Sequence, residues 1–138
     1  MQVQPYLMFD GRCEEAIAFY QRAVGAELVT LKRYGEMKSV GNAPPMPQEK
    51  VMHAALRIGD TVVFVSDGMC AGKPGFQGFS LSITAGSDAE AARLFDAIAT
   101  DGGQVQMPIA KSFFASSFGM VADKFGVSWM VLAGIVEA

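Results

Sequence analysis

The sequence predicts an α+β fold in which two βαβββ modules form a curved mixed β-sheet with their helices on the outer face. One observation is that the order strand, helix, strand, long loop and hairpin occurs twice along the 138 residues. Another is that Phe19 and Phe95 occupy matching positions in the two predicted helices, as Gly59 and Gly126 do in the two hairpin turns. Neither half can bury both faces of its sheet alone, so pairing of the halves is expected to leave a curved inner face as a cavity.

We expect residues 1–138 to be one domain, because a chain of this length builds a single core. Within it, module 1 is expected to cover about 1–68 and module 2 about 78–138. The segment 69–77 between them contains glycine and proline and is interpreted as a linker.

In the first module, the elements follow from the spacing of apolar residues. Between Cys13 and Val24 these residues recur every three or four positions, which is typical of a helix, and Gly25 supplies its end. The polar loop 35–49 is too long for a mere connection and is expected to be a flap, an interface arm or a mobile segment. The predicted order is strand Val3–Phe9, helix Cys13–Val24, strand Ala26–Tyr34, loop 35–49 and hairpin strands Val51–Ile58 and Thr61–Ser66.

The hairpin of the first module carries the first functional hint. Strand alternation places Ala54 and Leu56 on one face and His53 and Arg57 on the other, with a two-residue turn at Gly59-Asp60. One face must join the core. The face that carries His53, the only histidine, is therefore expected to meet water, a cavity or a partner.

The second module repeats the pattern. Ser87 and Glu90 form a capping box that predicts the start of its helix, and Gly102-Gly103 predicts the end. The predicted order is strand Phe79–Thr84, a helix after Ser87, strand Gln104–Met107, loop Pro108–Ser116 and hairpin strands Ser117–Ala122 and Val127–Ala133.

Composition excludes several classes of function. The formal net charge is −3 without a basic run, which argues against nucleic-acid binding. No apolar run approaches the roughly 20 residues that span a bilayer, and the N-terminus has no secretory signal pattern. Cys13 and Cys70 are interpreted as free thiols in a reducing cytoplasm. Only 18% of residues are charged, which is compatible with a buried oligomer interface.

Several segments together resemble the vicinal-oxygen-chelate superfamily of glyoxalase I, bleomycin-resistance proteins and extradiol dioxygenases, and most closely its PhnB-like branch. The hairpin that contains His53 and the ending DKFGVSWMV are similar to that branch, whereas AIAFYQRAVGAE is typical of the whole superfamily. The matching segments are Pro5–Gly11, Glu14–Glu27, Lys50–Asp67, Gly78–Ile83 and Phe118–Val131. The resemblance implies a homodimer with cavities at or near paired sheets.

The resemblance also implies four positions for metal ligands on strands. In this sequence they fall on Pro5, Phe64, Ser80 (or Phe79) and Met130. These side chains are not a ligand set for zinc or a hard cation, so we expect no metal and no cofactor. Members of the branch sometimes carry a demethylubiquinone methyltransferase label, but the sequence lacks a glycine-rich loop between a strand and a helix that would hold an adenosyl cofactor.

Three polar residues are candidates for chemistry. His53 could act as a general base or orient a ligand, and the alternative is a structural histidine that bonds a neighbouring strand or a partner subunit. Arg57 could pair with an anionic substrate, and the alternative is an ion-paired strand residue. Cys13 lies near a helix N-terminus, which would lower its pKa, but no histidine lies close to it in the sequence.

Aromatic and methionine residues around the predicted sheet suggest an apolar cavity, with ordinary core or dimer interface as the alternative. The strongest hypothesis is a metal-independent binder of a small apolar or aromatic molecule. The alternative is a glyoxalase-type lyase, isomerase or dioxygenase that uses His53, and a purely structural role is a third possibility. The candidate ligand-binding residues are His53, Arg57, Phe64, Ser80, Met120 and Met130.

Overall fold

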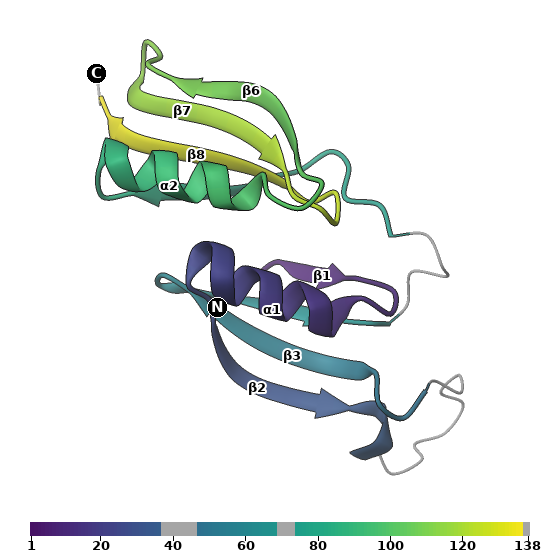
Figure 1. Ribbon diagram of the computed structural model, residues 1–138. Coiled ribbons are helices and arrows are strands. Elements are labelled where there is room, and N and C mark those ends of the chain that lie inside the picture. Colours follow the sequence, from purple (N-terminus) through teal and green to yellow (C-terminus); the bar gives the residue numbers. More distant parts are fainter. Residues whose placement is uncertain (37–46, 69–73, 137–138) are drawn as a thin grey trace. The chain divides into compact units, whose positions relative to one another are not determined.

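The structure is a computed structural model that describes residues 1–36, 47–68 and 74–136 (Figure 1). The chain divides into two compact units, Met1–Pro74 and Gly75–Ala138, and each is described by itself. Most of the predicted linker 69–77, including Cys70, and residues 37–46 of the predicted loop 35–49 lie outside the described residues.

The first unit is a four-stranded mixed sheet with one α-helix. In the sheet order β1-β4-β3-β2, β1 runs parallel to β4 and the other neighbours are antiparallel. The helix has the predicted bounds and ends at Gly25, whose left-handed backbone has φ 68°. The elements are β1 (Tyr6–Met8), α1 (Cys13–Val24), β2 (Glu27–Arg33), a 3₁₀ helix (Tyr34–Glu36), β3 (Val51–Ile58) and β4 (Thr61–Ser66).

The core of the first unit lies between α1 and one face of its sheet (Figure 1). Alternation along β3 and β4 sends every second side chain to this covered face. As the sequence predicts, Ala54 and Leu56 are fully buried there. We call the other face of each sheet, which its helix does not cover, the open face. His53 and Arg57 lie on the open face of the first sheet.

The start of α1 is stabilised from a distance. Arg12 at its N-cap makes no capping side-chain bond. Instead, the buried carboxylate of Asp67, just after β4, accepts a hydrogen bond from the Cys13 backbone N–H at 2.8 Å. Its other oxygen accepts the Val51 N–H at 2.8 Å. One carboxylate therefore joins the first turn of the helix to the start of β3.

The second unit has the same order of elements, which confirms the α+β class and the repeated βαβββ arrangement. Its sheet order is β5-β8-β7-β6, with β5 parallel to β8 and the other neighbours antiparallel. Helix α2 packs on β8, β7 and β5 (Figure 1). The elements are β5 (Leu81–Ala85), α2 (Asp88–Ile98), β6 (Gln104–Ala110), β7 (Ala115–Ala122) and β8 (Ser128–Ile135).

Local side chains define the ends of elements in this unit. The predicted N-cap at Ser87 is confirmed, because Ser87 Oγ accepts the Glu90 N–H at 3.1 Å. Glu90 Oε2 accepts the N–H of Gly86 at 3.1 Å, one residue before the N-cap N–H that a complete capping box would use. At the β7–β8 turn, the buried Asp123 accepts the indole N–H of Trp129 at 2.9 Å. Asp123 also accepts the backbone N–H of Val127, so it fixes both the turn and the orientation of the tryptophan.

Several predicted element boundaries were wrong. Strand β6 continues through Pro108 to Ala110, and β7 begins at Ala115, so most of the predicted loop Pro108–Ser116 is strand. The edge position of β6 and its register shifts against β7 allow a proline, because an edge strand has backbone N–H positions without a partner. The first strand is also shorter than predicted, since β1 contains only Tyr6–Met8.

Within the described residues, neither helix is long and apolar enough to cross a membrane.

Candidate functional site

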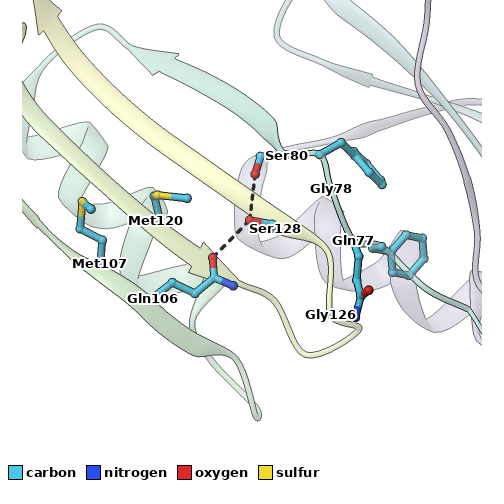
Figure 2. Close-up of a pocket in the computed structure, with 10 residues that line it drawn as sticks. Gln77, Gly78, Ser80, Gln106, Met107, Met120, Gly126 and Ser128 are labelled. Carbon is cyan, nitrogen blue, oxygen red and sulfur yellow. Dashed lines mark hydrogen bonds between the residues drawn. The ribbon is translucent and has the colours of Figure 1, made fainter.

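The open face of the second sheet carries a pocket of about 790 Å³ (Figure 2). Alternation along β8 places Ser128 on this face and the buried Trp129 on the covered face. The apolar part of the pocket lining is Phe76, Phe79, Met107 and Met120. The polar part is Gln77, Ser80, Gln106 and Ser128, with backbone at Gly78 and Gly126.

A row of hydrogen bonds crosses the floor of this pocket. Ser80 Oγ donates to Ser128 Oγ at 2.9 Å, and Ser128 Oγ donates to Gln106 Oε1 at 3.2 Å (Figure 2). The three residues come from the segment before β5, from β8 and from β6. Of the described residues that line the pocket, none carries a formal charge. The pocket therefore offers apolar surface and neutral hydrogen-bonding groups.

The open face of the first sheet carries three clustered rings. Parallel pairing of β1 with β4 sets Tyr6 opposite Phe64, and the next strand brings His53 beside them. Ring centroids are 5.2 Å apart for His53 and Phe64, 5.6 Å for Tyr6 and His53 and 6.0 Å for Tyr6 and Phe64. A hydrogen bond of 3.2 Å joins Tyr6 Oη to His53 Nδ1. Lys32 pairs with His53 across the β2–β3 ladder.

Charged side chains also lie along this ladder. Arg57, predicted as a ligand-binding residue, forms an ion pair with Glu27 on β2 at 3.4 Å, and both side chains are largely exposed. An exposed pair of this kind contributes little stability, about 0–1 kcal/mol. Arg57 therefore occupies the ion-paired arrangement that the sequence left open as its alternative role.

Tyr34 follows β2 in the 3₁₀ helix of the first unit. Its pKa is raised above the usual tyrosine value by burial, with smaller contributions from the charges of Asp67 and Tyr6. Tyr34 is therefore a protonated phenol throughout the physiological range.

The positions that the resemblance assigns to metal ligands do not fit a metal. Pro5 precedes β1 and has no donor side chain, Phe64 belongs to the ring cluster, and Ser80 donates its hydroxyl to Ser128. Met130 supplies only a thioether, which is a poor ligand for zinc or a hard cation. Among residues 1–36, 47–68 and 74–136, no group of three or more His, Cys, Asp and Glu side chains is arranged to hold a metal ion.

Cys13 is a free thiol, as expected, but the expected lowering of its pKa was wrong. Its side chain is fully buried, and burial raises the pKa of the thiol far above its ordinary value, with further contributions from the negative charges of Asp67 and Glu14. The favourable field of a helix N-terminus is therefore outweighed by desolvation and by the carboxylate that caps the helix. Cys13 is a core residue.

Four of the six predicted ligand-binding residues belong to the pocket or to the ring cluster, and two belong to neither. Ser80 and Met120 line the pocket of the second unit, and His53 and Phe64 belong to the ring cluster of the first. Met130 pairs with Met120 on the open face of the second sheet but is not part of the pocket lining, and Arg57 is ion-paired.

Sequence reasoning missed several polar residues of the two sites. Gln77, Gln106 and Ser128 line the pocket, and Tyr6 bonds His53, but none was a candidate. Gln106 carried only a weak signal, because it is a polar residue between Val105 and Met107, but the same strand also contains Gln104. Tyr6 and His53 meet only through the long-range pairing of β1 with β4, for which the sequence has no local signal.

The order of the elements is the one that the resemblance to PhnB-like proteins implies. Residues 1–132 match the model of the family described as 3-demethylubiquinone-9 3-methyltransferase, and the chain belongs to this family.

Curated and solved relatives agree with this assignment. Protein YjdN of Escherichia coli (strain K12) is 40% identical over 139 residues, which cover 95% of this chain and 94% of YjdN. The crystal structure of protein PA1353 from Pseudomonas aeruginosa is 41% identical, with a TM-score of 0.83 and coverage of 97% of this chain and 98% of that one. A PhnB protein from Bacillus cereus is 26% identical, with a TM-score of 0.79 and coverage of 97% and 100%.

The fold extends to more distant proteins. The fosfomycin resistance protein FosX from Mesorhizobium loti has a TM-score of 0.66 at 12% identity, with coverage of 99% of this chain and 93% of that one. At this identity the likeness concerns the fold alone.

Proposed function

We propose that this protein binds a small apolar or aromatic molecule, without a metal, in the pocket on the open face of the second sheet. The observation that carries the proposal is the pocket itself. Its volume of about 790 Å³ is that of a small-molecule site, and rings and thioethers form its apolar lining. A flat ligand can pack on Phe79, while Met107 and Met120 adapt to its outline.

Metal independence is supported by the chemistry of the side chains. The four positions discussed above provide one hydroxyl and one thioether, and the hydroxyl of Ser80 is already engaged with Ser128. Binding energy is then expected from buried apolar area and from neutral hydrogen bonds.

Calorimetric titration with a panel of aromatic compounds tests the proposal. Met120→Gln keeps the side-chain length but removes apolar lining, and we expect it to weaken binding by about tenfold, which corresponds to 1.4 kcal/mol. Leu28→Gln alters an exposed apolar residue of β2 in the first unit and is the matched control. Binding should also survive treatment with a chelator. Tight uptake of about one metal ion per chain, with binding lost on chelation, would overturn metal independence.

A second candidate function is an acid–base reaction at His53. The observation that favours it is the hydrogen bond between Tyr6 Oη and His53 Nδ1, because a phenol that orients an imidazole prepares it to accept or donate a proton. Deuterium exchange into acetophenone, an enolisable ketone, offers a test. We expect His53→Gln to abolish any catalysed exchange and Tyr6→Phe to reduce it, while Arg57→Gln leaves it unchanged. Exchange that persists in His53→Gln would exclude this role.

We also propose a homodimer in the cytoplasm. Support for the dimer comes from the low charge content and from exposed apolar side chains on one edge strand of each sheet, Leu28 and Val29 on β2 and Val105 on β6. Light scattering coupled to size-exclusion chromatography measures the mass directly, and a value near 14.7 kDa would rule out the dimer.

A further inference from the structure

We infer that the pocket of the second unit selects uncharged ligands that carry a hydrogen-bond acceptor, such as an aryl ketone, and that the side-chain amide of Gln106 is the group that recognises this acceptor. The inference rests on the proposed function, because it names the class of ligand that the same pocket takes.

The hydrogen bonds on the pocket floor all run in one direction. The hydroxyl of Ser80 donates a hydrogen bond to Ser128 Oγ, and the hydroxyl of Ser128 donates one to Gln106 Oε1. Both hydroxyl protons are therefore used within the row, and the carbonyl of Gln106 is occupied. The row ends at the Gln106 amide nitrogen, which is a donor only.

The position of that nitrogen carries the second step. No hydrogen bond of the described residues uses Gln106 Nε2, and Figure 2 shows that the amide oxygen of Gln106, not its nitrogen, is the atom bonded to Ser128. Gln106 lies in the pocket lining beside Met107. A ligand that covers this nitrogen without accepting its proton would leave a donor unpaired, which costs binding free energy.

The charge of the lining carries the third step. The described lining residues are all uncharged, and the serine hydroxyls are already committed. A carboxylate would have to lose water without meeting a cation, which is unfavourable. A hydrocarbon would lose no hydrogen bonds to water, but it would leave the amide unpaired. A neutral acceptor on an aromatic body avoids both penalties.

Three probes of similar shape separate these possibilities: 2-acetylnaphthalene, 2-isopropylnaphthalene and 2-naphthoate. Calorimetry on the full chain should show that the ketone binds about tenfold more tightly than either of the others. Gln106→Leu should weaken ketone binding by about tenfold and should strengthen hydrocarbon binding, because the variant has no amide for the hydrocarbon to leave unpaired. Gln104→Leu is the matched control, because Gln104 is an exposed glutamine of the same strand outside the pocket lining.

Each other outcome counts against the inference in a different way. If the naphthoate binds as tightly as the ketone, or if Gln106→Leu weakens ketone and hydrocarbon equally, selection by the amide is wrong while the pocket remains a binding site. If none of the three probes binds, both the inference and the proposed function fail. Circular dichroism of the Gln106→Leu and Gln104→Leu variants confirms that they are folded.

Discussion

The two units have the same order of elements and the same sheet order, yet their open faces differ in chemistry. The first unit presents ionisable and aromatic groups, with Tyr6, His53 and Phe64 in contact and an Arg57–Glu27 ion pair nearby. The second presents a neutral pocket of thioethers, rings, amides and hydroxyls. The covered faces preserve the fold in both units, so the open faces are free to diverge toward different chemistry.

The starts of the two helices differ in a similar way. Helix α2 is capped by Ser87, the residue just before it, whereas α1 is capped by Asp67, which lies 54 residues further along the chain than Cys13. A local cap stabilises mainly its own helix, but a distant cap also joins two elements. We therefore expect the same kind of substitution to have different costs in the two units.

The largest effect is expected for Asp67→Asn. An amide offers one acceptor and turns its NH₂ group toward a backbone N–H, so either Cys13 or Val51 loses its partner in the core. We expect the free energy of unfolding to fall by about 3 kcal/mol in urea titrations. Asp60→Asn changes an exposed carboxylate at a hairpin turn and should alter stability by less than about 0.5 kcal/mol. Equal costs for the two variants would contradict the role of Asp67 as a cap.

The next effect concerns packing in the second unit. A Cβ atom at Gly119 on β7 would lie 2.7 Å from Phe95 on α2 and 2.9 Å from the backbone of Ile109 on β6. Gly119→Ala should therefore destabilise by about 1–3 kcal/mol through overpacking. Gly75→Ala, where the added Cβ meets nothing within 4 Å, is the control and should be nearly neutral. A neutral Gly119→Ala would show that helix and sheet can separate without cost.

A smaller effect is expected for the local cap. Ser87→Ala removes the acceptor for the Glu90 N–H and should cost about 1 kcal/mol. Ser87→Asp restores an acceptor and places a negative charge at a helix N-terminus, so stability should return to near the original value. If Ser87→Ala costs as much as Asp67→Asn, local and distant caps do not differ in this protein.

The smallest effect is a dependence on pH. Hydroxyls of Ser116 and Ser117 donate to Asp88 Oδ1, each at 2.6 Å, and they lower the pKa of this carboxyl below its ordinary value of 3.8. A lowered folded-state pKa stabilises the fold at pH values above the unfolded-state pKa, and this contribution is lost as the pH falls through the folded-state pKa. Asp88→Asn should thus be slightly less stable than the unmodified chain at neutral pH and equal to it in strong acid. Urea midpoints measured across this range test the sign.

Much of the fold could be predicted because its signals are local. The spacing of apolar residues defined Cys13–Val24, and Ser87 with Glu90 defined the start of α2. The predicted end of strand β6 was wrong, because whether a proline is tolerated in a strand depends on the position of that strand in the sheet. Pro108 breaks an inner strand but is accommodated on the edge strand β6, and edge position is a property of the topology.

The sites were less predictable because they depend on register. Ser80 and Met120 were chosen from the sequence and line the pocket, but Gln106 joins them only because β6, β7 and β8 pair with particular offsets and bulges. The predicted lowering of the Cys13 pKa was wrong for a related reason. Its helix start was visible in the sequence, whereas the buried carboxylate of Asp67 beside it was not.

The buried indole of Trp129 has a spectroscopic consequence. It is the only tryptophan of the chain, and it lies in the second unit with its N–H bound to Asp123. Intrinsic fluorescence excited at the indole band therefore reports on the unfolding of the second unit alone, while far-ultraviolet circular dichroism averages over both helices and both sheets. Comparing the two signals in one melting experiment would show whether the repeated halves lose structure together or one after the other.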